Sequence, residues 1–173
     1  DAIDAIGLLS PVDYGQKIAL CQGVWVRFND VGHLLGSASI EVWVEEDGVS
    51  KKIVFSGDVG NIDQPIIKDP SAVKEADYVV IESTYGNRIH EDRDVTEEQL
   101  LGVVDDTCVY RGGKLLIPSF SVGRTQEIVY ALNQLYNDGR LPRIPVYVDS
   151  PLSVNATQIF RMYPQALSDE VRD

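Results

Sequence analysis

The sequence predicts a mixed α/β protein, with a β-rich first part and an α/β second part. Segments between residues 24 and 55 alternate apolar and polar side chains, which is the pattern of half-buried strands. After residue 86, short apolar runs alternate with longer segments of helical spacing, an order typical of parallel β–α–β units. We therefore expect an antiparallel meander followed by a parallel α/β layer, with the boundary between residues 87 and 88.

The first part is expected to contain successive strands at residues 24–28, 39–45 and 52–55. In the second of these, Ile40, Val42 and Val44 lie on one face, and Glu41, Trp43 and Glu45 lie on the other. Turn residues Asp47 and Gly48 predict a hairpin into the third strand. The apolar run 78–81 predicts a strand buried on both faces. Residues 1–22 show no clear periodicity.

The second part begins with a predicted helix. Thr96 and Gln99 form a T-x-x-Q capping box, and the paired glycines 112–113 end the helical pattern. Strands are expected at residues 114–117 and 146–148. Helices are expected at residues 125–136 and about 153–163, the latter closed by Pro164.

The chain is acidic, with 27 acidic and 15 basic residues and a formal net charge of −12. This is a poor match to a stand-alone nucleic-acid binder, but it leaves open an enzyme that meets nucleic acid through metals and a few arginines. Cys21 and Cys108 predict buried, reduced thiols. The sequence has no apolar run long enough for a membrane span and no signal-like start, so we expect a cytoplasmic protein without membrane contact.

Three side chains are candidates for metal chemistry. His33 and Asp58 stand at the two ends of the predicted hairpin, and Glu82 follows the apolar run 78–81. Such residues at strand ends commonly hold a divalent metal, but a structural role is the commoner fate of a single loop His or Asp. A catalytic zinc needs at least three protein ligands, and these residues furnish three at best. His90, in the polar run 87–94, is interpreted as a solvated loop residue.

A second candidate is the loop Ser119–Thr125, between a predicted strand and a strong helix. Ser119, Ser121 and Arg124, together with the helix N–H groups, are suited to phosphate binding. The alternative is a helix cap beside a surface arginine. The P-loop pattern is absent.

Five motifs in order resemble a known family. They are Gly-His-Leu-Leu-Gly-Ser-Ala at 32–38, Phe-Ser-Gly-Asp at 55–58, Ile-Glu-Ser-Thr-Tyr-Gly-Asn-Arg at 81–88, Ile-Pro-Ser-Phe-Ser-Val-Gly-Arg-Thr-Gln-Glu at 117–127 and Val-Asp-Ser-Pro-Leu at 148–152. The series resembles the β-CASP branch of the metallo-β-lactamase superfamily, and within it the RNA-processing members related to the endonuclease of mRNA 3′-end cleavage.

The resemblance implies a fold and a set of roles. Residues 1–87 would form part of a metallo-β-lactamase αββα sandwich, and residues 88–173 the N-terminal part of a β-CASP cap domain. His33 would bind one zinc, and Asp58 would bridge two. Glu82 would be the acidic residue of the first β-CASP motif and support a histidine from later in the family's sequence. The implied activity is zinc-dependent hydrolysis of RNA phosphodiester bonds.

Two departures from the family limit what this chain is expected to do. The H-x-H-x-D-H motif, which supplies most zinc ligands, is absent, and so are the later β-CASP histidines. We therefore expect a central fragment with weak or no zinc binding and no nuclease activity by itself. We also expect exposed apolar surface, with self-association of this stretch or a homodimer of the parent protein.

Two alternatives compete with the ribonuclease hypothesis. A non-catalytic α/β scaffold or interaction subunit of an RNA-processing complex would not need to keep both His33 and Asp58. A superfamily hydrolase acting on a small substrate would not need the long α/β segment after Glu82.

Overall fold

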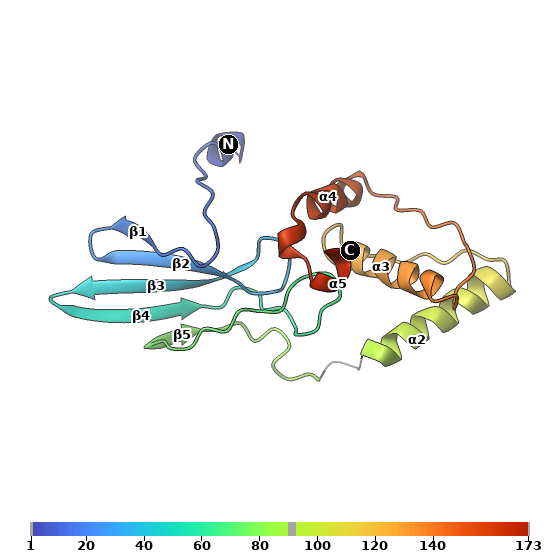
Figure 1. Ribbon diagram of the computed structural model, residues 1–173, viewed down its shortest axis with the longest axis horizontal. Helices are drawn as coiled ribbons and strands as arrows, with labels where there is room; N and C mark the ends of the chain where they lie inside the picture. Colours follow the sequence, from blue (N-terminus) through green and yellow to red (C-terminus); the bar gives the residue numbers. More distant parts are fainter. Residues whose placement is uncertain (1, 90–92, 173) are drawn as a thin grey trace. The chain divides into compact units, whose positions relative to one another are not determined.

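The computed structural model describes residues 2–89 and 93–172 (Figure 1). The chain divides into two compact units, one of residues 1–63 and 69–83 and the other of residues 64–68 and 84–173. The division after Ser83 lies near the boundary predicted between residues 87 and 88. The assignment of the two parts to the family's two domains stays a prediction.

The first unit is built on a five-stranded sheet in the order β1-β2-β3-β4-β5. β1 to β4 are antiparallel neighbours, as the predicted meander requires, and β5 pairs parallel with β4. The elements are α1 (Ala2–Ile6), β1 (Ile18–Cys21), β2 (Val24–Asp30), β3 (Ala38–Glu46), β4 (Val49–Phe55) and β5 (Tyr78–Val80). Neither α1 nor β1 is among the predicted elements, because the first 22 residues have no periodicity to indicate them.

The hairpin between β3 and β4 forms at the predicted turn. Asp47 and Gly48 have φ angles of 51° and 76°, and Glu46 lies opposite Val49. Positive φ at both central residues is the type I′ geometry whose twist matches that of the flanking strands. This turn sets the register that brings Ile40 opposite Phe55 at the other end of the hairpin.

The prediction that residues 78–81 form a strand buried on both faces is wrong. β5 lies at the edge of the sheet, and Tyr78, Val79 and Val80 are 59%, 60% and 55% exposed. An apolar run is buried on both faces only where other layers cover both faces, and the described residues do not cover β5. The expected exposed apolar surface is therefore present, and whether it drives self-association stays a prediction.

The polar face of β3 holds the most buried carboxylate of the sheet. Ile40, Val42 and Val44 do share one face, since each lies opposite a residue of the same face on β2. Glu41, on the other face, is only 1% exposed and is paired with both Arg27 and Lys52. Asn29 Nδ2 also donates to Glu41 Oε2, at 3.1 Å. Burial by itself raises the pKa of Glu41, but the hydrogen bonds from Arg27, Lys52 and Asn29 outweigh it and lower that pKa to about 2.

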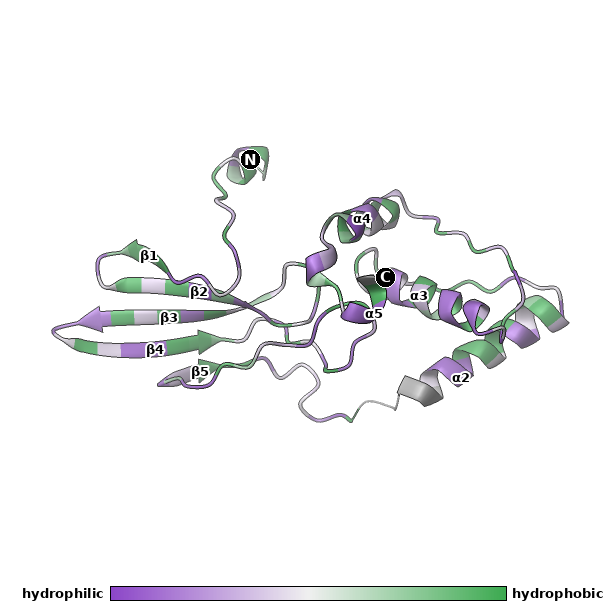
Figure 2. Cartoon of the chain, viewed as in Figure 1, coloured by the Kyte–Doolittle hydropathy of each residue, from purple (hydrophilic) through white to green (hydrophobic). Residues whose placement is uncertain are grey.

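The second unit is helical in its described residues. The elements are α2 (Arg93–Val104), a π-helical turn η1 (Asp105–Tyr110), α3 (Arg124–Asn137), α4 (Pro151–Met162), a 3₁₀ turn η2 (Pro164–Ala166) and α5 (Asp169–Arg172). Val104, Leu132, Leu135 and Leu141 form its buried core, with Leu100 and Leu101 of α2 packed against them. Figure 2 shows the polar and apolar bands of α3 that produce this one-sided burial.

Helix boundaries differ from the predicted ones at two starts. The described part of α2 already includes Arg93, before the predicted capping box, so Thr96 lies inside the helix. α4 begins at Pro151, because the Ser150 hydroxyl oxygen accepts a hydrogen bond from the Ser153 N–H and caps the helix there. The helix over residues 125–136 and the stop at Gly112 are confirmed.

The strands predicted at residues 114–117 and 146–148 are not formed. Both segments lack strand pairing, and Leu116 and Tyr147 are largely exposed. The predicted parallel crossover is therefore wrong for the described residues of this unit, because a strand exists only through hydrogen bonds to a neighbouring strand.

Both cysteines are free thiols, but only Cys108 is partly buried. Cys21 is exposed, because it ends the edge strand β1. In the described part of the chain, no helix combines the length and apolar character that a membrane span requires.

Candidate functional site

The topology of the sheet brings the three candidate metal-site residues to one end of it. His33 follows β2, Asp58 follows β4 and Glu82 follows β5. β2 and β4 are each antiparallel to β3, so their carboxyl ends lie at the same end of the sheet. β5 is parallel to β4 and ends there too. The loops after these strands therefore emerge side by side.

Two glycines bring the loops of His33 and Asp58 into backbone contact. The Gly60 N–H donates to the Val31 carbonyl oxygen at 2.9 Å. A Cβ on Gly60 would lie 1.7 Å from the Gly32 carbonyl oxygen and 2.7 Å from the His33 nitrogen. Gly57 has a φ of 59°, and a Cβ there would lie 2.7 Å from the Ala38 carbonyl oxygen. Only glycine fits at these positions without moving a loop.

The loop that carries His33 is held by Ser37. The Ser37 hydroxyl oxygen accepts hydrogen bonds from the His33 N–H at 3.2 Å and the Leu34 N–H at 3.1 Å. The Tyr14 hydroxyl donates to the Ser37 carbonyl oxygen at 2.7 Å. Partial burial and, to a lesser extent, the Asp30 carboxylate raise the pKa of Tyr14, so its hydroxyl keeps the proton that it donates. The His33 side chain itself is exposed.

Glu82 is tied to the loop that carries Asp58. One carboxylate oxygen, Oε1, accepts a hydrogen bond from the Val59 N–H at 2.6 Å. The Glu82 N–H donates to the hydroxyl of buried Ser56 at 3.0 Å, and the Ser56 N–H donates to the Val80 carbonyl oxygen at 2.9 Å. The Glu82 carboxylate is therefore paired, although the strand before it is not buried. Its predicted role toward a later histidine stays a prediction.

Removing the Glu82 carboxylate should loosen the Asp58 loop. In Glu82→Ala, the Val59 N–H loses its acceptor, and we expect its amide hydrogen to exchange about tenfold faster, since a hydrogen bond to a charged group contributes about 1.5 kcal/mol or more. Glu82→Gln retains an acceptor oxygen and serves as the matched control. Hydrogen exchange followed by NMR measures both, and equal exchange in the two variants would contradict this role.

The donor chemistry at this end of the sheet fits zinc, but the number of donors falls short. Imidazole and carboxylate are both ordinary zinc ligands, and the side chains of His33 and Asp58 are exposed on adjoining loops. Among the residues that the structure describes, no group of three or more His, Cys, Asp or Glu side chains is placed to hold a metal ion. His90 lies outside the described residues. A zinc site here would need ligands beyond these two.

The predicted phosphate-binding residues lie in the second unit, at the start of α3. The Ser119 and Thr125 hydroxyls lie 2.9 Å apart, and the Thr125 hydroxyl donates to the Phe120 carbonyl oxygen at 2.7 Å. Arg124 is exposed and pairs with Glu127 at 3.0 Å. The Ser119 hydroxyl is thus engaged inside the loop, while the guanidinium of Arg124 stays at the surface beside one carboxylate.

Sequence reasoning missed Gln126, which organises this loop. Its side chain is buried, and its Oε1 accepts a hydrogen bond from the Gly123 N–H at 2.8 Å. Its Nε2 donates to the Ser121 carbonyl oxygen at 3.2 Å and to Thr157 Oγ1 of α4 at 3.0 Å. Gln126 thus supplies the glutamine half of a capping box, but N-cap Gly123 has no side chain, so the sequence lacks the S-x-x-Q or T-x-x-Q pattern that would have indicated it.

Comparison with known proteins supports the family resemblance. The family model described as the Beta-Casp domain matches residues 125–173. The chain is also similar to curated proteins along nearly its whole length.

These relatives are named as nucleases and as transcription termination factors. A ribonuclease of Thermus thermophilus is 38% identical over 173 residues, which are 99% of this chain and 38% of the relative. The transcription termination factor FttA of Methanocaldococcus jannaschii is 34% identical over 94% of this chain and 25% of the relative. The endoribonuclease ysh1 of Schizosaccharomyces pombe is 31% identical over 99% of this chain and 22% of the relative. The chain therefore spans well under half the length of these relatives.

The chain is thus similar to β-CASP ribonucleases and to related transcription termination factors, and the resemblance carried by the five motifs is confirmed. The mixed α/β fold class is confirmed by the sheet and the helices. The roles of individual site residues stay predictions.

Proposed function

We propose that this chain supplies part of the active site of a zinc-dependent ribonuclease that hydrolyses RNA phosphodiester bonds in RNA processing or decay. The observation that carries the proposal is the backbone contact between the loops of His33 and Asp58, at the sheet end where Glu82 also lies. The ribonuclease names of the relatives support RNA as the substrate. Free thiols are consistent with a cytoplasmic location.

The candidate residues of this chain would have different roles in the reaction. His33 and Asp58 would each provide a zinc ligand, and Glu82 would hold the Asp58 loop through Val59. Arg124, with Ser119 and Ser121, would bind an RNA phosphate. Zinc bound there supplies Lewis acidity that offsets the negative charge developing on the scissile phosphate.

The chain by itself would bind zinc weakly and would not cleave RNA, because two ligands are fewer than a catalytic zinc requires. We further propose that the activity belongs to a protein with additional ligands. A homodimer of that protein, or self-association of this stretch through its exposed apolar surface, is part of the same proposal.

A chimaera tests this function directly. The 173 aligned residues of the Thermus thermophilus ribonuclease would be replaced by this chain, and cleavage of labelled RNA would be measured. We expect cleavage that a chelator abolishes, and a loss of at least about a hundredfold in His33→Ala and in Asp58→Ala, because each change removes a ligand. Asp13→Ala, which removes an exposed loop carboxylate, is the control and should leave the rate unchanged.

The opposite outcome favours the second function. A chimaera that folds, as judged by circular dichroism, but cleaves no RNA would support a non-catalytic scaffold or interaction subunit. Cleavage that persists after the chelator would overturn the zinc mechanism.

A further inference from the structure

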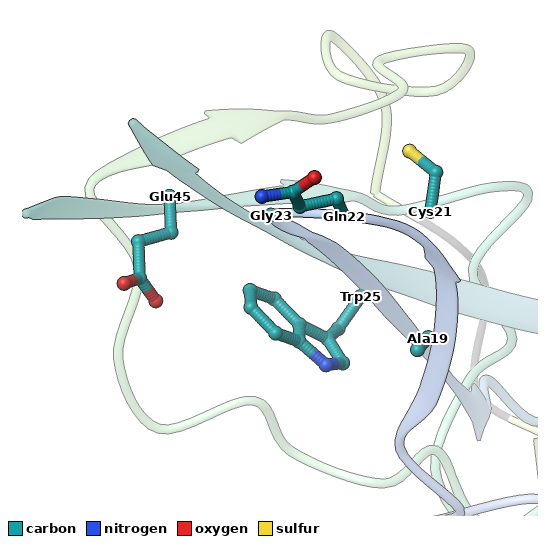
Figure 3. Close-up of a pocket in the computed structure, with 6 residues that line it drawn as sticks. All are labelled: Ala19, Cys21, Gln22, Gly23, Trp25 and Glu45. Carbon is teal, nitrogen blue, oxygen red and sulfur yellow. The ribbon is translucent and has the colours of Figure 1, made fainter. Parts of the chain in front are cut away.

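A hollow on the first unit lies at the end of the sheet opposite the candidate metal site. It is formed where β1 turns into β2, beside the last residues of β3, and has a volume of about 530 Å³. This size is within the roughly 300–1,000 Å³ of pockets that hold small organic groups. Its lining residues are Ala19, Cys21, Gln22, Gly23, Trp25 and Glu45. Figure 3 shows the Trp25 ring and the Glu45 carboxylate extending to the same side of the hairpin.

Both tryptophans of the chain lie on this face of the sheet. Trp25 of β2 is directly opposite Trp43 of β3, so their side chains point to the same side. Indole rings are the platforms on which unpaired nucleobases stack in proteins that bind single strands.

Basic side chains surround the two rings. Lys17 Nζ lies 5.2 Å from the centre of the Trp25 ring and 4.2 Å from that of Trp43. Arg27 and Lys52 lie 5.2 and 5.3 Å from the Trp43 ring. Glu41 and Glu45 neutralise two of these three cations, so this face carries a net charge of +1 in a chain whose net charge is −12. Because charges in physiological salt are screened beyond about 8 Å, a phosphate at this face is governed by the local cations.

Glu45 gives the hollow a preference for one kind of nucleobase. Its carboxylate accepts hydrogen bonds and donates none, so it favours a base edge that carries an amino group. Cytosine presents the N4 amino group, whereas uracil presents the O4 carbonyl oxygen at the same position, which a carboxylate repels.

We infer that this face of the sheet is a single-stranded RNA contact. One unpaired base bearing an exocyclic amino group would stack on Trp25 with its amino group directed to Glu45, and Lys17 would meet the adjoining phosphate. The choice of RNA rests on the proposed function. The test measures binding and not cleavage, so its failure and that of the ribonuclease proposal are distinguishable.

Tryptophan fluorescence reads this surface directly, because both tryptophans lie on it. The 173-residue chain would be titrated with short oligocytidylate and with oligouridylate of the same length. We expect quenching by both and an affinity at least about tenfold higher for oligocytidylate, since one correct base-edge contact discriminates by about that factor. Equal affinities for the two, or no change in fluorescence up to millimolar RNA, would overturn the inference.

Matched variants distinguish RNA binding at this face from a general effect of positive charge. Lys17→Ala should weaken binding by several-fold and reduce the salt dependence by about one phosphate contact. Lys51→Ala removes the same charge from the other face of β4, where Lys51 pairs with Asp77, and should leave the affinity unchanged. An equal loss in the two variants would overturn the inference.

Glu45→Gln tests the base preference. The variant has one negative charge fewer, so binding of oligouridylate should tighten and the preference for oligocytidylate should shrink. Quenching by polyglutamate as strong as that by RNA would show a site for acidic peptides in general, and the RNA inference would then be wrong.

Discussion

Replacing Glu41 by glutamine is expected to lower the free energy of unfolding of the first unit by about 3 kcal/mol. The change leaves Arg27 and Lys52 beside a neutral group, and breaking a buried ion pair by removing one partner costs about 3–5 kcal/mol. We place the expected loss at the lower end because Arg27 remains 36% exposed and part of its charge is solvated. Urea unfolding at neutral pH, followed by tryptophan fluorescence, measures the difference.

The same variant should change how stability depends on acid. The pKa of Glu41 is about 2 in the folded chain against an ordinary value of 4.5, so the folded state favours the ionised carboxylate. Its contribution is present above pH 4.5 and is lost as the pH falls from about 4.5 toward about 2. The stability difference between wild type and Glu41→Gln should therefore shrink across that window.

Glu46→Gln is the matched control. Glu46 is the exposed last residue of β3, and its replacement should change the stability by no more than about 0.5 kcal/mol. A destabilisation by Glu41→Gln no greater than that of the control would show that the ion pairs of Glu41 with Arg27 and Lys52 do not stabilise the fold.

Replacing Gly60 by alanine is expected to disrupt the contact between the loops of His33 and Asp58. The new Cβ would lie 1.7 Å from the Gly32 carbonyl oxygen, and backbone atoms cannot yield as a flexible side chain does. Relieving such an overlap costs about 3 kcal/mol or more and moves the two loops apart. Urea unfolding measures the loss of stability. Faster hydrogen exchange of the amide at position 60, which in the wild type donates to the Val31 carbonyl oxygen, shows where the structure opens.

Gly102→Ala separates this effect from the general consequence of replacing a glycine. Gly102 lies in α2, and a Cβ added there would meet no atom within 4 Å, so alanine should stabilise the helix by up to about 1 kcal/mol. Equal stability of Gly60→Ala and the wild type would mean that the loops adjust freely, and the glycine contact would then have no role in the site.

Several parts of the fold could be predicted because their signals are local. The alternation around Val42, the Asp47-Gly48 turn and the helical spacing of Ile128, Leu132 and Leu135 each reflect a backbone period that nearby residues impose. The predicted strands at 114–117 and 146–148 failed for the opposite reason. Whether an apolar run pairs as a strand depends on distant neighbours.

The candidate site shows the same division between local and distant information. The motifs around His33, Asp58 and Glu82 carry part of the family resemblance and point to the candidate site residues. They do not indicate that Glu82 accepts from the Val59 N–H or that Gly60 abuts Gly32, because partners separated by more than twenty residues are not encoded in spacing.

By itself, the sequence determined the family resemblance, the mixed α/β class and the choice of candidate ligands, since residue types and short periods carry that information. Only the tertiary structure decided that the loops of His33, Asp58 and Glu82 meet at one end of the sheet. It also decided that Glu41 is the buried charge and that Trp25 and Trp43 share a basic face. Strand order and register produce these contacts, and both are set by hydrogen bonds and packing between segments far apart in the chain.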